Sequence, residues 1–347
     1  MVSNLNIIEG PYLKDLLDQP VALQNTVDAL EYAPFRRLHE ESRRYQRIVL
    51  TGMGSSLHAL YPLHLELVAA GLPSMHLETA ELVHYQAELL TKRTLLVAVS
   101  QSGRSAEIVH LLDIAKERRC RLIGVTNDPM SPLAGESESL LVMHAGEESS
   151  VSCKTFVATL LVLEWLGALM LGRNLEETRA ALAKSVTATE EYLAAWRRHL
   201  EAFACSLEGV GHVFVVGRGR SIAAAQTGGL ILKESTHVPA EGMSSAAFRH
   251  GPFESISPQT YVMVMEGDSR TAGLNSRLAE DIRAAGGRAG LVSASAANEE
   301  CRIPGSDESI RPILEILPVQ MLSLALAALR GREAGRFTLG SKVTTTE

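Results

Sequence analysis

The sequence is poor in cysteine, in aromatic residues and in basic charge, and each shortage excludes a class of protein. Four cysteines are scattered over 347 residues, without the closely spaced pairs that hold a metal ion. We therefore expect free thiols, no metal site and a cytoplasmic protein. Aromatic residues make up only 5% of the chain, and the formal net charge is −7. Because nucleic-acid-binding surfaces are basic and often aromatic, we expect no nucleic-acid partner.

Long hydrophobic runs are also missing. A transmembrane helix needs roughly 20 consecutive apolar residues, and the nearest candidate, Val157–Leu171, is interrupted by Glu164. This stretch is predicted to be a buried helix. The N-terminus lacks the basic start and the apolar core of a signal peptide. We expect no membrane partner, and a hydrophobic content of 46% is ample for a large buried core.

Short apolar runs alternate with helical stretches along the chain, which is typical of parallel sheets covered by helices on both faces. The first set of predicted strands comprises Ile48–Leu50, Met75–Leu77, Leu95–Val99, Arg121–Val125 and Leu140–Met143. A long helical region, Lys154–Leu171 with Glu176–Glu208, separates it from the second set. The second set comprises His212–Val216, Tyr261–Met265, Arg288–Val292 and Ile313–Leu317.

The two sets of strands share a register, which indicates a duplication. Gly52 and Gly54 have counterparts 165 positions later, at Gly217 and Gly219. This spacing predicts two tandem α/β domains, each a doubly wound parallel sheet between two helical layers. We place an N-terminal segment at 1–24, the first domain at 25–190, the second domain at 191–336 and a C-terminal tail at 337–347.

The residues that follow the third predicted strand form a pattern suited to an anion. Ser100, Ser102 and Ser105 supply hydroxyl groups, and the helix that follows presents free N–H groups. Gly103 permits close approach of the backbone to a ligand, and no acidic residue occurs in the turn. We predict that it binds a phosphate monoester; an ordinary serine-rich loop is the alternative. The corresponding residues 265–268 include two acids, so the phosphate is expected in the first half only.

A glycine-rich turn follows the first strand of each set, at Thr51–Ser56 and again 165 positions later. A dinucleotide-binding turn needs a third glycine, where this chain has Leu57 and Ile222. We therefore expect no nicotinamide and predict no other cofactor. Ser55 and Ser56 suit a second contact to the same sugar phosphate, and simple capping of the next helix is the alternative.

Two residues of the second half are candidates for acid–base chemistry. Glu234 lies on a predicted helix, and His250 follows sixteen residues later. A carboxylate near an imidazole provides a general base and a group that exchanges a proton with a sugar ring oxygen. A solvated helix glutamate and a capping histidine are the alternatives. Lys342, in an apolar C-terminal stretch, is a further candidate, with an ordinary surface lysine as its alternative.

Taken together, these motifs resemble those of the double sugar-isomerase (SIS) domain family, because five of that family's motifs occur in order. They are Gly52–Ser56, Ser100–Gly103, Val151–Phe156, Leu232–Glu234 and Arg249–Pro252. The resemblance is to the isomerase half of glucosamine-6-phosphate synthase and to its stand-alone relatives, and it runs from Leu17–Pro20 to Ser341–Thr344. It implies two flavodoxin-like domains, each of three layers, αβα.

The resemblance also implies roles for individual residues. The implied phosphate-binding positions are Ser55, Ser56, Ser100, Gln101, Ser102 and Ser105. Ser152 falls on a sugar-hydroxyl contact, and Glu234 falls on the base that moves a proton between C1 and C2. His250 falls on the residue assigned to ring opening, which in this family comes from the other subunit of a homodimer. Lys342 lies one position beyond the lysine that forms a Schiff base with the open-chain sugar.

The chain departs from the synthase in three ways. It shows no amidotransferase domain and no N-terminal cysteine nucleophile, so we expect no glutaminase activity. Thr227 and Ile231 stand where the synthase has a glutamate and a lysine on the catalytic helix, so proton traffic around C1 and C2 must differ. Finally, Ser341–Lys342 reverses the Lys-Ser order of the synthase, which puts the Schiff-base role of Lys342 in doubt.

These observations predict a metal-independent enzyme that acts on a 6-phosphorylated amino sugar. It would open the ring, move a proton between C1 and C2 and release ammonia or an amine, as glucosamine-6-phosphate deaminases and fructosamine-6-phosphate deglycases do. Aldose–ketose isomerisation without C–N cleavage is the second hypothesis, and a non-enzymatic phosphosugar-sensing module is the third. The expected partners are a sugar phosphate and a second copy of the chain, with active sites shared between the subunits.

Overall fold

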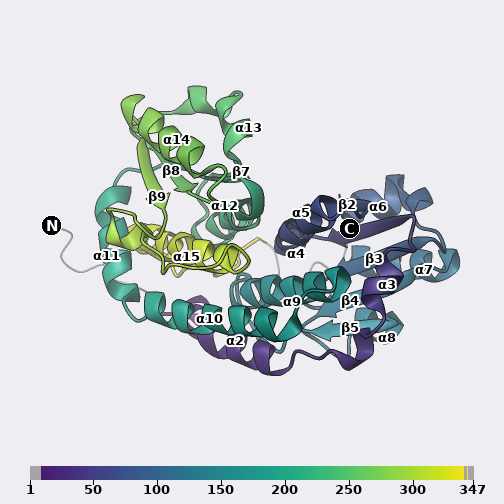
Figure 1. The fold of residues 1–347 in the computed structure, drawn as a ribbon. Helices are drawn as coiled ribbons and strands as arrows, with labels where there is room; N and C mark the ends of the chain where they lie inside the picture. The colour runs from purple at the N-terminus through teal and green to yellow at the C-terminus, as the bar shows by residue number, and fades with distance from the viewer. Residues whose placement is uncertain (1–8, 340–341, 343–347) are drawn as a thin grey trace. The chain divides into compact units, whose positions relative to one another are not determined.

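A computed structural model describes residues 9–339 and Lys342, and the chain divides into two compact units (Figure 1). The first-sheet unit contains Val21–Glu147, Lys154–Ala183 and Ser341–Glu347. The second-sheet unit contains Lys184–Gly340, Glu148–Cys153 and the residues up to Pro20. The predicted boundaries at residues 24, 190 and 336 stay predictions, since this division follows spatial contacts and not the duplicated sequence unit.

The first-sheet unit is built on five parallel strands in the order β2-β1-β3-β4-β5. The strands are β1 (Arg47–Gly52), β2 (Ser74–Glu78), β3 (Thr94–Val99), β4 (Arg121–Thr126) and β5 (Ser139–Val142). This is the strand order of flavodoxin-like folds, in which ligands bind beyond the carboxyl ends of the strands. All five strands were predicted from their apolar runs, and this part of the prediction is confirmed.

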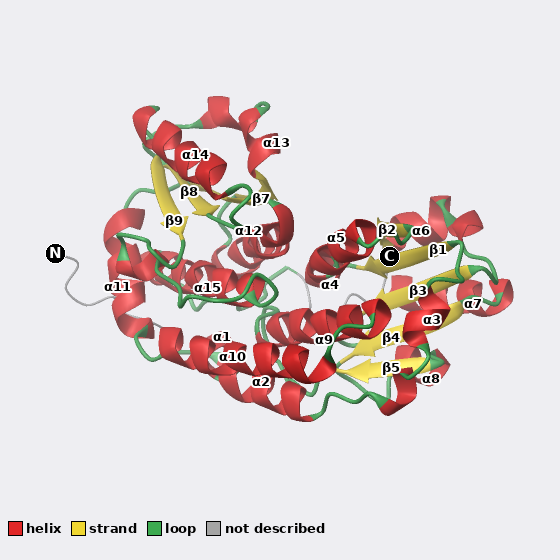
Figure 2. Cartoon of the chain, viewed as in Figure 1, coloured by secondary structure: helices red, strands yellow, loops and turns green. Residues whose placement is uncertain are grey.

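Helices cover both faces of this sheet (Figure 2). One group consists of α9 (Lys154–Leu171) and the helices packed against it, α3 (Leu38–Ser42), α4 (Gly54–Ala59) and α5 (Tyr61–Ala69). The other consists of α6 (Thr79–Tyr85), α7 (Ala106–Arg118) and α8 (Pro132–Glu136), which share a buried core with Val49 and Leu96 of the sheet. The remaining elements are α2 (Gln19–Asp28), η1 (Ala33–Phe35), η2 (Ala87–Leu89) and α10 (Leu175–Leu193), of which α2 and α10 run across the division between the units.

The second-sheet unit repeats this plan with four parallel strands in the order β7-β6-β8-β9. The strands are β6 (His212–Gly217), β7 (Ala240–Ser244), β8 (Thr260–Met265) and β9 (Arg288–Val292). The order matches that of the first four strands of the other sheet, as a duplicated unit requires. A single parallel bridge between Ser293 and Arg302 follows β9 in place of a fifth strand.

Two helical layers also enclose the second sheet (Figure 1). On one face, α12 (Ile222–Thr236) contacts β6, β7 and α15 (Arg311–Leu329). On the other, α13 (Ser245–Arg249) and α14 (Ala272–Ala284) bury an apolar cluster with Phe214, Val262 and Val264 of the strands. The unit also contains α1 (Pro11–Leu17), α11 (Trp196–Leu207), η3 (Gly219–Ser221), η4 (Pro252–Ser255) and η5 (Glu299–Cys301). The predicted class, two parallel-sheet α/β domains with helices on both faces, is confirmed.

The strand predictions for the second half need two corrections. Ile313–Leu317 is not a strand but part of α15, a 19-residue helix that is buried along almost its whole length. A continuous apolar run does not distinguish a buried strand from a buried helix, and the available start signal was Pro312 in the first turn. The strand that was missed, β7, is a short edge strand of sequence AEGMS, whose residues have little preference for strands.

Among residues 9–339, two helices, α9 and α15, are long and apolar enough to cross a bilayer. However, 94% of the apolar window in α9 and 89% of that in α15 are buried inside the structure, where these helices form the layers described above. Helices that are apolar on all sides are also found in the cores of large proteins.

Helix α12 lies unusually close to β7 because both carry glycine at the contact. A Cβ atom on Gly229 of α12 would lie 2.2 Å from the backbone nitrogen of Gly242, and a Cβ atom on Gly242 would lie 2.1 Å from the carbonyl oxygen of Ala225. Neither position tolerates a side chain unless the backbone moves. The position of α12 on the sheet, and of every side chain that α12 carries, depends on this contact.

Candidate functional site

The two serine-containing loops of the first-sheet unit start side by side at the carboxyl edge of its sheet. Gly52, the last residue of β1, pairs with Val99, the last residue of β3. Ser55 and Ser56 follow in the first turn of α4, and both are partly buried. The predicted serine positions of the two loops therefore lie at adjacent strand ends, where a doubly wound sheet binds its ligand.

The loop between β3 and α7 is held in a tight turn. The backbone N–H of Ser100 donates to the carbonyl of Val125 (3.0 Å), and the N–H of Gly103 donates to Ser100 Oγ (3.1 Å). Gly103 has φ +61°, and a Cβ atom there would lie 2.2 Å from Ser131 Oγ, so only glycine fits. Ser105 is the N-cap residue of α7 and makes no side-chain capping bond, so its hydroxyl is not used to cap this helix.

Gln101 and Ser102 complete this loop, and both are partly buried. The carbonyl of Gln101 accepts hydrogen bonds from the N–H of Asn127 (3.0 Å) and from the hydroxyl of Thr126 (3.2 Å), so the loop is fastened to the end of β4. Ser102 Oγ accepts the N–H of Arg104 (3.2 Å). Together, these contacts fix the backbone of the loop without using a charged side chain.

A cation that sequence reasoning did not single out stands beside this loop. Arg104 is exposed, and its guanidinium contacts the carboxylate of Asp128 at 2.8 Å and donates to the carbonyl of Met130 at 3.0 Å. The hydrogen bond from Arg104 lowers the pKa of Asp128. Because Asp128 already balances its charge, Arg104 adds little net positive charge, and an anion would rely on N–H and hydroxyl groups.

Glu234 lies in the second-sheet unit, near the C-terminal end of α12, on the wall of a pocket of about 450 Å³. The side chain is partly buried. The pocket is lined by Lys233, Glu234, His237, Val238, Pro239, Phe337, Thr338 and Leu339. All of these residues belong to the same unit, so the pocket is complete within it.

The segment that carries Ser152 belongs to the second-sheet unit although it lies between two parts of the first in sequence. The N–H of Ser149 donates to Asp15 Oδ2 (3.0 Å), and the N–H of Cys153 donates to Glu148 Oε1 (2.9 Å). Both acids are buried. Two carboxylates therefore hold this loop by its backbone, with Ser152 partly buried between the two bonds.

A chain of hydrogen bonds connects this segment to the helix end that carries Glu234. Ser150 Oγ donates to the carbonyl of Gly335 (2.6 Å), and the N–H of Gly335 donates to the carbonyl of Ser235 (3.3 Å), the residue after Glu234. The turn at Gly335, with φ +76°, thus brings the Ser152 segment and the Glu234 end of α12 together.

Tyr12 of α1 is fully buried near the same group of residues. Its hydroxyl lies 3.1 Å from Ser323 Oγ. Burial is the main cause that raises the pKa of Tyr12 well above its usual value, and electrostatic interactions with Cys153, Glu234 and Glu148 act in the same direction. The phenol therefore stays protonated and serves as an uncharged neighbour of the carboxylates.

In the second sheet, side chains of the same unit hold the loop that corresponds to the serine loop. Arg311 donates to the carbonyl of Gly267 (2.7 Å), and Asn275 donates to that of Glu266 (2.9 Å). Glu315 of α15 is buried beneath, accepting the hydroxyl of Ser221 (2.9 Å), and burial raises its pKa to about 7.

His250 and Lys342 were also predicted to act on the sugar, and their roles stay predictions. His250 is exposed at the end of α13 and does not line the pocket. Lys342 is partly buried and belongs to the first-sheet unit by its contacts, whereas its neighbours in sequence lie outside the described residues. The predicted residues therefore divide between the units. Ser152, Glu234 and His250 belong to the second-sheet unit; Ser55, Ser56, Ser100, Gln101, Ser102, Ser105 and Lys342 belong to the first-sheet unit.

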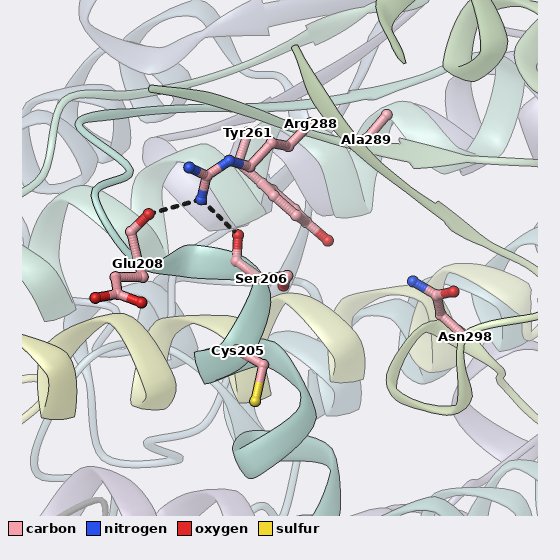
Figure 3. A pocket seen from close by; sticks show the side chains of 7 residues that line it. All are labelled: Cys205, Ser206, Glu208, Tyr261, Arg288, Ala289 and Asn298. Atoms are coloured by element: carbon pink, nitrogen blue, oxygen red, sulfur yellow. Dashed lines mark hydrogen bonds between the residues drawn. The ribbon is translucent and has the colours of Figure 1, made fainter. Parts of the chain in front are cut away.

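A second pocket of about 500 Å³ lies at the amino ends of β8 and β9 and contains none of the predicted residues. Arg288 stands in this pocket and donates through Nη1 to the carbonyls of Ser206 (2.9 Å) and Glu208 (2.7 Å), at the end of α11 (Figure 3). Arginine commonly satisfies the free carbonyls at a helix C-terminus. Its position here is explained by that structural task.

Sequence reasoning missed the residues that hold the site together, namely Tyr12, Asp15, Glu148 and Gly335. Each acts through a contact with a residue more than four positions away, and most of these contacts span over a hundred positions. Glu148 had one local signal, since a carboxylate just before a turn often binds the N–H groups of that turn.

The comparisons with known proteins agree with this architecture. The model of the SIS domain matches the chain twice, at residues 43–169 and 206–330. Glutamine–fructose-6-phosphate aminotransferase (isomerizing) of Pyrococcus horikoshii is 28% identical over 338 residues, which cover 93% of this chain and 56% of that protein. The chain thus spans about half the length of the curated relatives it matches.

Two solved structures have the same fold. The C-terminal domain of glucosamine-fructose-6-phosphate aminotransferase from Francisella tularensis matches with a TM-score of 0.83 at 21% identity, over 95% of this chain and 98% of that one. Glucosamine-6-phosphate deaminase from Thermotoga maritima matches with a TM-score of 0.77 at 21% identity, over 93% of this chain and 96% of that one.

Proposed function

Because the chain belongs to the SIS domain family, we propose that it is an enzyme that removes the nitrogen substituent from a 6-phosphorylated amino sugar. It is a SIS protein with homology to the isomerase domain of glutamine–fructose-6-phosphate aminotransferase. The observation that carries the proposal is the position of Glu234. Its carboxylate stands on the wall of a pocket, and the Ser152 segment is fastened to the adjoining residue through Gly335.

The proposed reaction uses Glu234 as the base for a sugar in its open-chain form. For a 1-amino-1-deoxy ketose 6-phosphate, Glu234 takes a proton from C1, the carbonyl oxygen at C2 gains a proton from water, and an enaminol with a C1=C2 double bond forms. A proton is returned to C2 while the nitrogen loses its own, which leaves an imine at C1. Water then adds to C1, the C1–N bond breaks, and the amine leaves with a proton, so that an aldose 6-phosphate remains. For a 2-amino aldose, the same steps run from C2 to C1 and release ammonia.

The phosphate group is assigned to the serine loops of the first-sheet unit. Hydroxyl groups and backbone N–H groups bind a phosphate dianion without a surrounding cation when they converge at a strand end. Ser105, which caps nothing in the described structure, and the partly buried Ser102 are the clearest donors. His250 and Lys342 are proposed to act in ring opening and in holding the open-chain sugar.

The direct test is to incubate the protein with glucosamine 6-phosphate and with a fructosamine 6-phosphate, and to measure ammonia and free amine. Release from either substrate supports the proposal and tells which nitrogen is removed. Interconversion of aldose and ketose without release of nitrogen would establish the isomerase alternative. Tight binding of a sugar phosphate without any turnover would establish a sensing module.

Replacing Ser102 by Ala is expected to weaken the binding of a sugar phosphate by about 1–3 kcal/mol, the usual effect of losing a hydrogen bond to a charged group. Thermal stability should change little, because Ser102 is partly exposed. The matched control is Ser269→Ala, an exposed serine in the corresponding loop after β8. The affinity for inorganic phosphate is measured by titration calorimetry. Equal affinities of wild type and Ser102→Ala would show that this loop does not bind the phosphate.

The active site is further proposed to be shared between two copies of the chain. His250 is exposed and lies outside the Glu234 pocket, which suits a residue that serves a neighbour. The adjacent Phe248 packs internally, 5.0 Å from the ring of Phe214, so the loop is anchored while His250 projects from it.

Mixing inactive Glu234→Gln subunits with inactive His250→Ala subunits is therefore expected to restore activity. In a heterodimer, one site carries both substitutions and the other carries neither. Because random exchange makes about half of the dimers heterodimers, recovery should approach about a quarter of the wild-type activity. Subunit exchange is verified by mass spectrometry. Exchange without recovery would place both residues in one subunit's site, and a monomer by light scattering would also contradict the shared site.

A further inference from the structure

The pocket beside Glu234 is much larger than a nitrogen atom requires. Its volume of about 450 Å³ falls within the range of pockets that hold a small organic ligand. The end of α12 forms one wall, the chain leading into β7 forms a second, and Phe337–Leu339 form a third. C1 and C2 of the sugar must also lie beside Glu234, and the rest of the pocket, lined by Val238, Pro239, Phe337 and Leu339, can take a group larger than ammonia.

The lining of the pocket is mainly apolar. Val238 and Pro239 contribute aliphatic surface from one wall, and Phe337 and Leu339 face them from another. Leu339 is 99% exposed, so this apolar side chain has no burial of its own within the described part of the chain. Apolar surface of this kind is stabilised when an apolar group covers it.

The charges around the pocket disfavour a ligand whose substituent carries a positive charge. Lys233 is exposed at the wall, next to Glu234 in sequence. His237 lies within hydrogen-bonding distance of Arg332, with 2.9 Å between Arg332 Nη2 and His237 Nδ1. The cationic side chains of Lys233 and Arg332 therefore stand at or next to the lining, and among the described residues that line the pocket Glu234 is the one carboxylate.

We propose that this pocket binds an apolar substituent carried by the nitrogen that is released, so that the substrate is the 6-phosphate of a fructosamine formed from an apolar amine. This inference rests on the proposed function, because it assumes that Glu234 serves C1 and C2. The nitrogen of such a substrate is one bond from C1. Its substituent must therefore occupy space that borders Glu234, and the pocket is such a space.

The first test compares three fructosamine 6-phosphates whose nitrogen carries methyl, n-pentyl or 4-aminobutyl. The n-pentyl and 4-aminobutyl groups have nearly the same size and differ in charge. Each fully buried methylene strengthens binding by about fourfold, so we expect the n-pentyl compound to bind at least about tenfold more tightly than the methyl compound. The 4-aminobutyl compound should bind no better than the methyl one. Affinities are measured by calorimetry in Glu234→Gln protein, which keeps the pocket and does not consume the ligand.

The second test changes the preference of the pocket for the n-pentyl substituent with one substitution. Phe337→Glu places a carboxylate in the apolar wall, and it should abolish the advantage of n-pentyl and make 4-aminobutyl the tighter ligand. Leu274→Glu is the control, because Leu274 is an exposed apolar residue of α14 that does not line the pocket. A purely structural role of Phe337 would weaken all three ligands equally and would not invert their order.

The outcomes separate this inference from the proposed function. If wild-type protein releases amine from all three compounds and binds them equally, the pocket assignment is wrong and the function stands. If the n-pentyl preference is found and inverted by Phe337→Glu while wild type releases no amine, the pocket assignment stands and the function is wrong. If none of the compounds binds, both are wrong. Equal loss of preference in the Leu274→Glu control also overturns the pocket assignment.

Discussion

Replacing Glu234 by Gln is expected to lower turnover by at least about 10²-fold, the usual contribution of a general base. Glutamine has nearly the same shape as glutamate but does not accept a proton from C1. Glu234 is only partly buried and lines an open pocket, so the substitution should leave the fold and the affinity for the sugar phosphate largely unchanged. The expected result is a fall in kcat with little change in ligand affinity, measured by steady-state kinetics and by calorimetry.

The matched control is Glu241→Gln, because Glu241 is the next carboxylate after Glu234 in the sequence. Its exposed carboxylate lies 3.9 Å from His212 Nε2, on β7. The activity of this variant should remain close to that of wild type. If Glu234→Gln kept full activity and Glu241→Gln lost most of it, Glu241 would be the base. The pocket beside Glu234 would then not be the place where the reaction occurs.

Replacing Gly229 by Ala is expected to destabilise the second-sheet unit by about 3 kcal/mol, the upper part of the range for overpacked cores. The added Cβ would lie 2.2 Å from the nitrogen of Gly242 and 2.7 Å from the carbonyl carbon of Glu241, both of which are backbone atoms. No side chain can rotate away to relieve this clash. Helix α12 must therefore move off β7, and turnover should fall as well, because α12 carries Glu234.

The control for this substitution is Gly273→Ala. Gly273 lies in the first turn of α14, and a Cβ atom there meets nothing within 4 Å. Alanine is favoured over glycine in helices by roughly 0.5–1 kcal/mol, so this variant should be as stable as wild type or slightly more stable. Urea unfolding followed by circular dichroism measures both variants. An unchanged midpoint for Gly229→Ala would show that α12 does not depend on the glycine contact.

The strands of the first sheet could be predicted because their signal is local. Every residue of β3 is buried, as its continuous apolar run predicts for a central parallel strand. A similar run gave a wrong strand prediction at Ile313–Leu317, where the apolar residues belong to a buried helix. The length of the apolar run and Pro312 at its start are the signals that distinguish the two cases. In β7, the glycine that admits α12 removes the side-chain pattern by which a strand is recognised.

The serine loop was also within reach of the sequence, for the same reason. The bond from the N–H of Gly103 to Ser100 Oγ spans three residues, and the positive φ of Gly103 is a property of that turn. Arg104 was overlooked because its partner, Asp128, lies 24 positions away in the next loop. Local geometry was predictable, and the charge balance around it was not.

By itself, the sequence determined the class of fold, the duplication, the serine loop and Glu234 as the candidate base. Each of these depends on residues that are close together in the chain or on a pattern that recurs along it. Only the tertiary structure decided that the Ser152 segment joins Glu234. The connection runs through a bond from Ser150 to Gly335, 185 positions away, and a bond from Gly335 to Ser235, the residue after Glu234. A contact over such a distance leaves no periodicity in the sequence, because it depends on how separately formed elements pack and on which buried carboxylates then need partners.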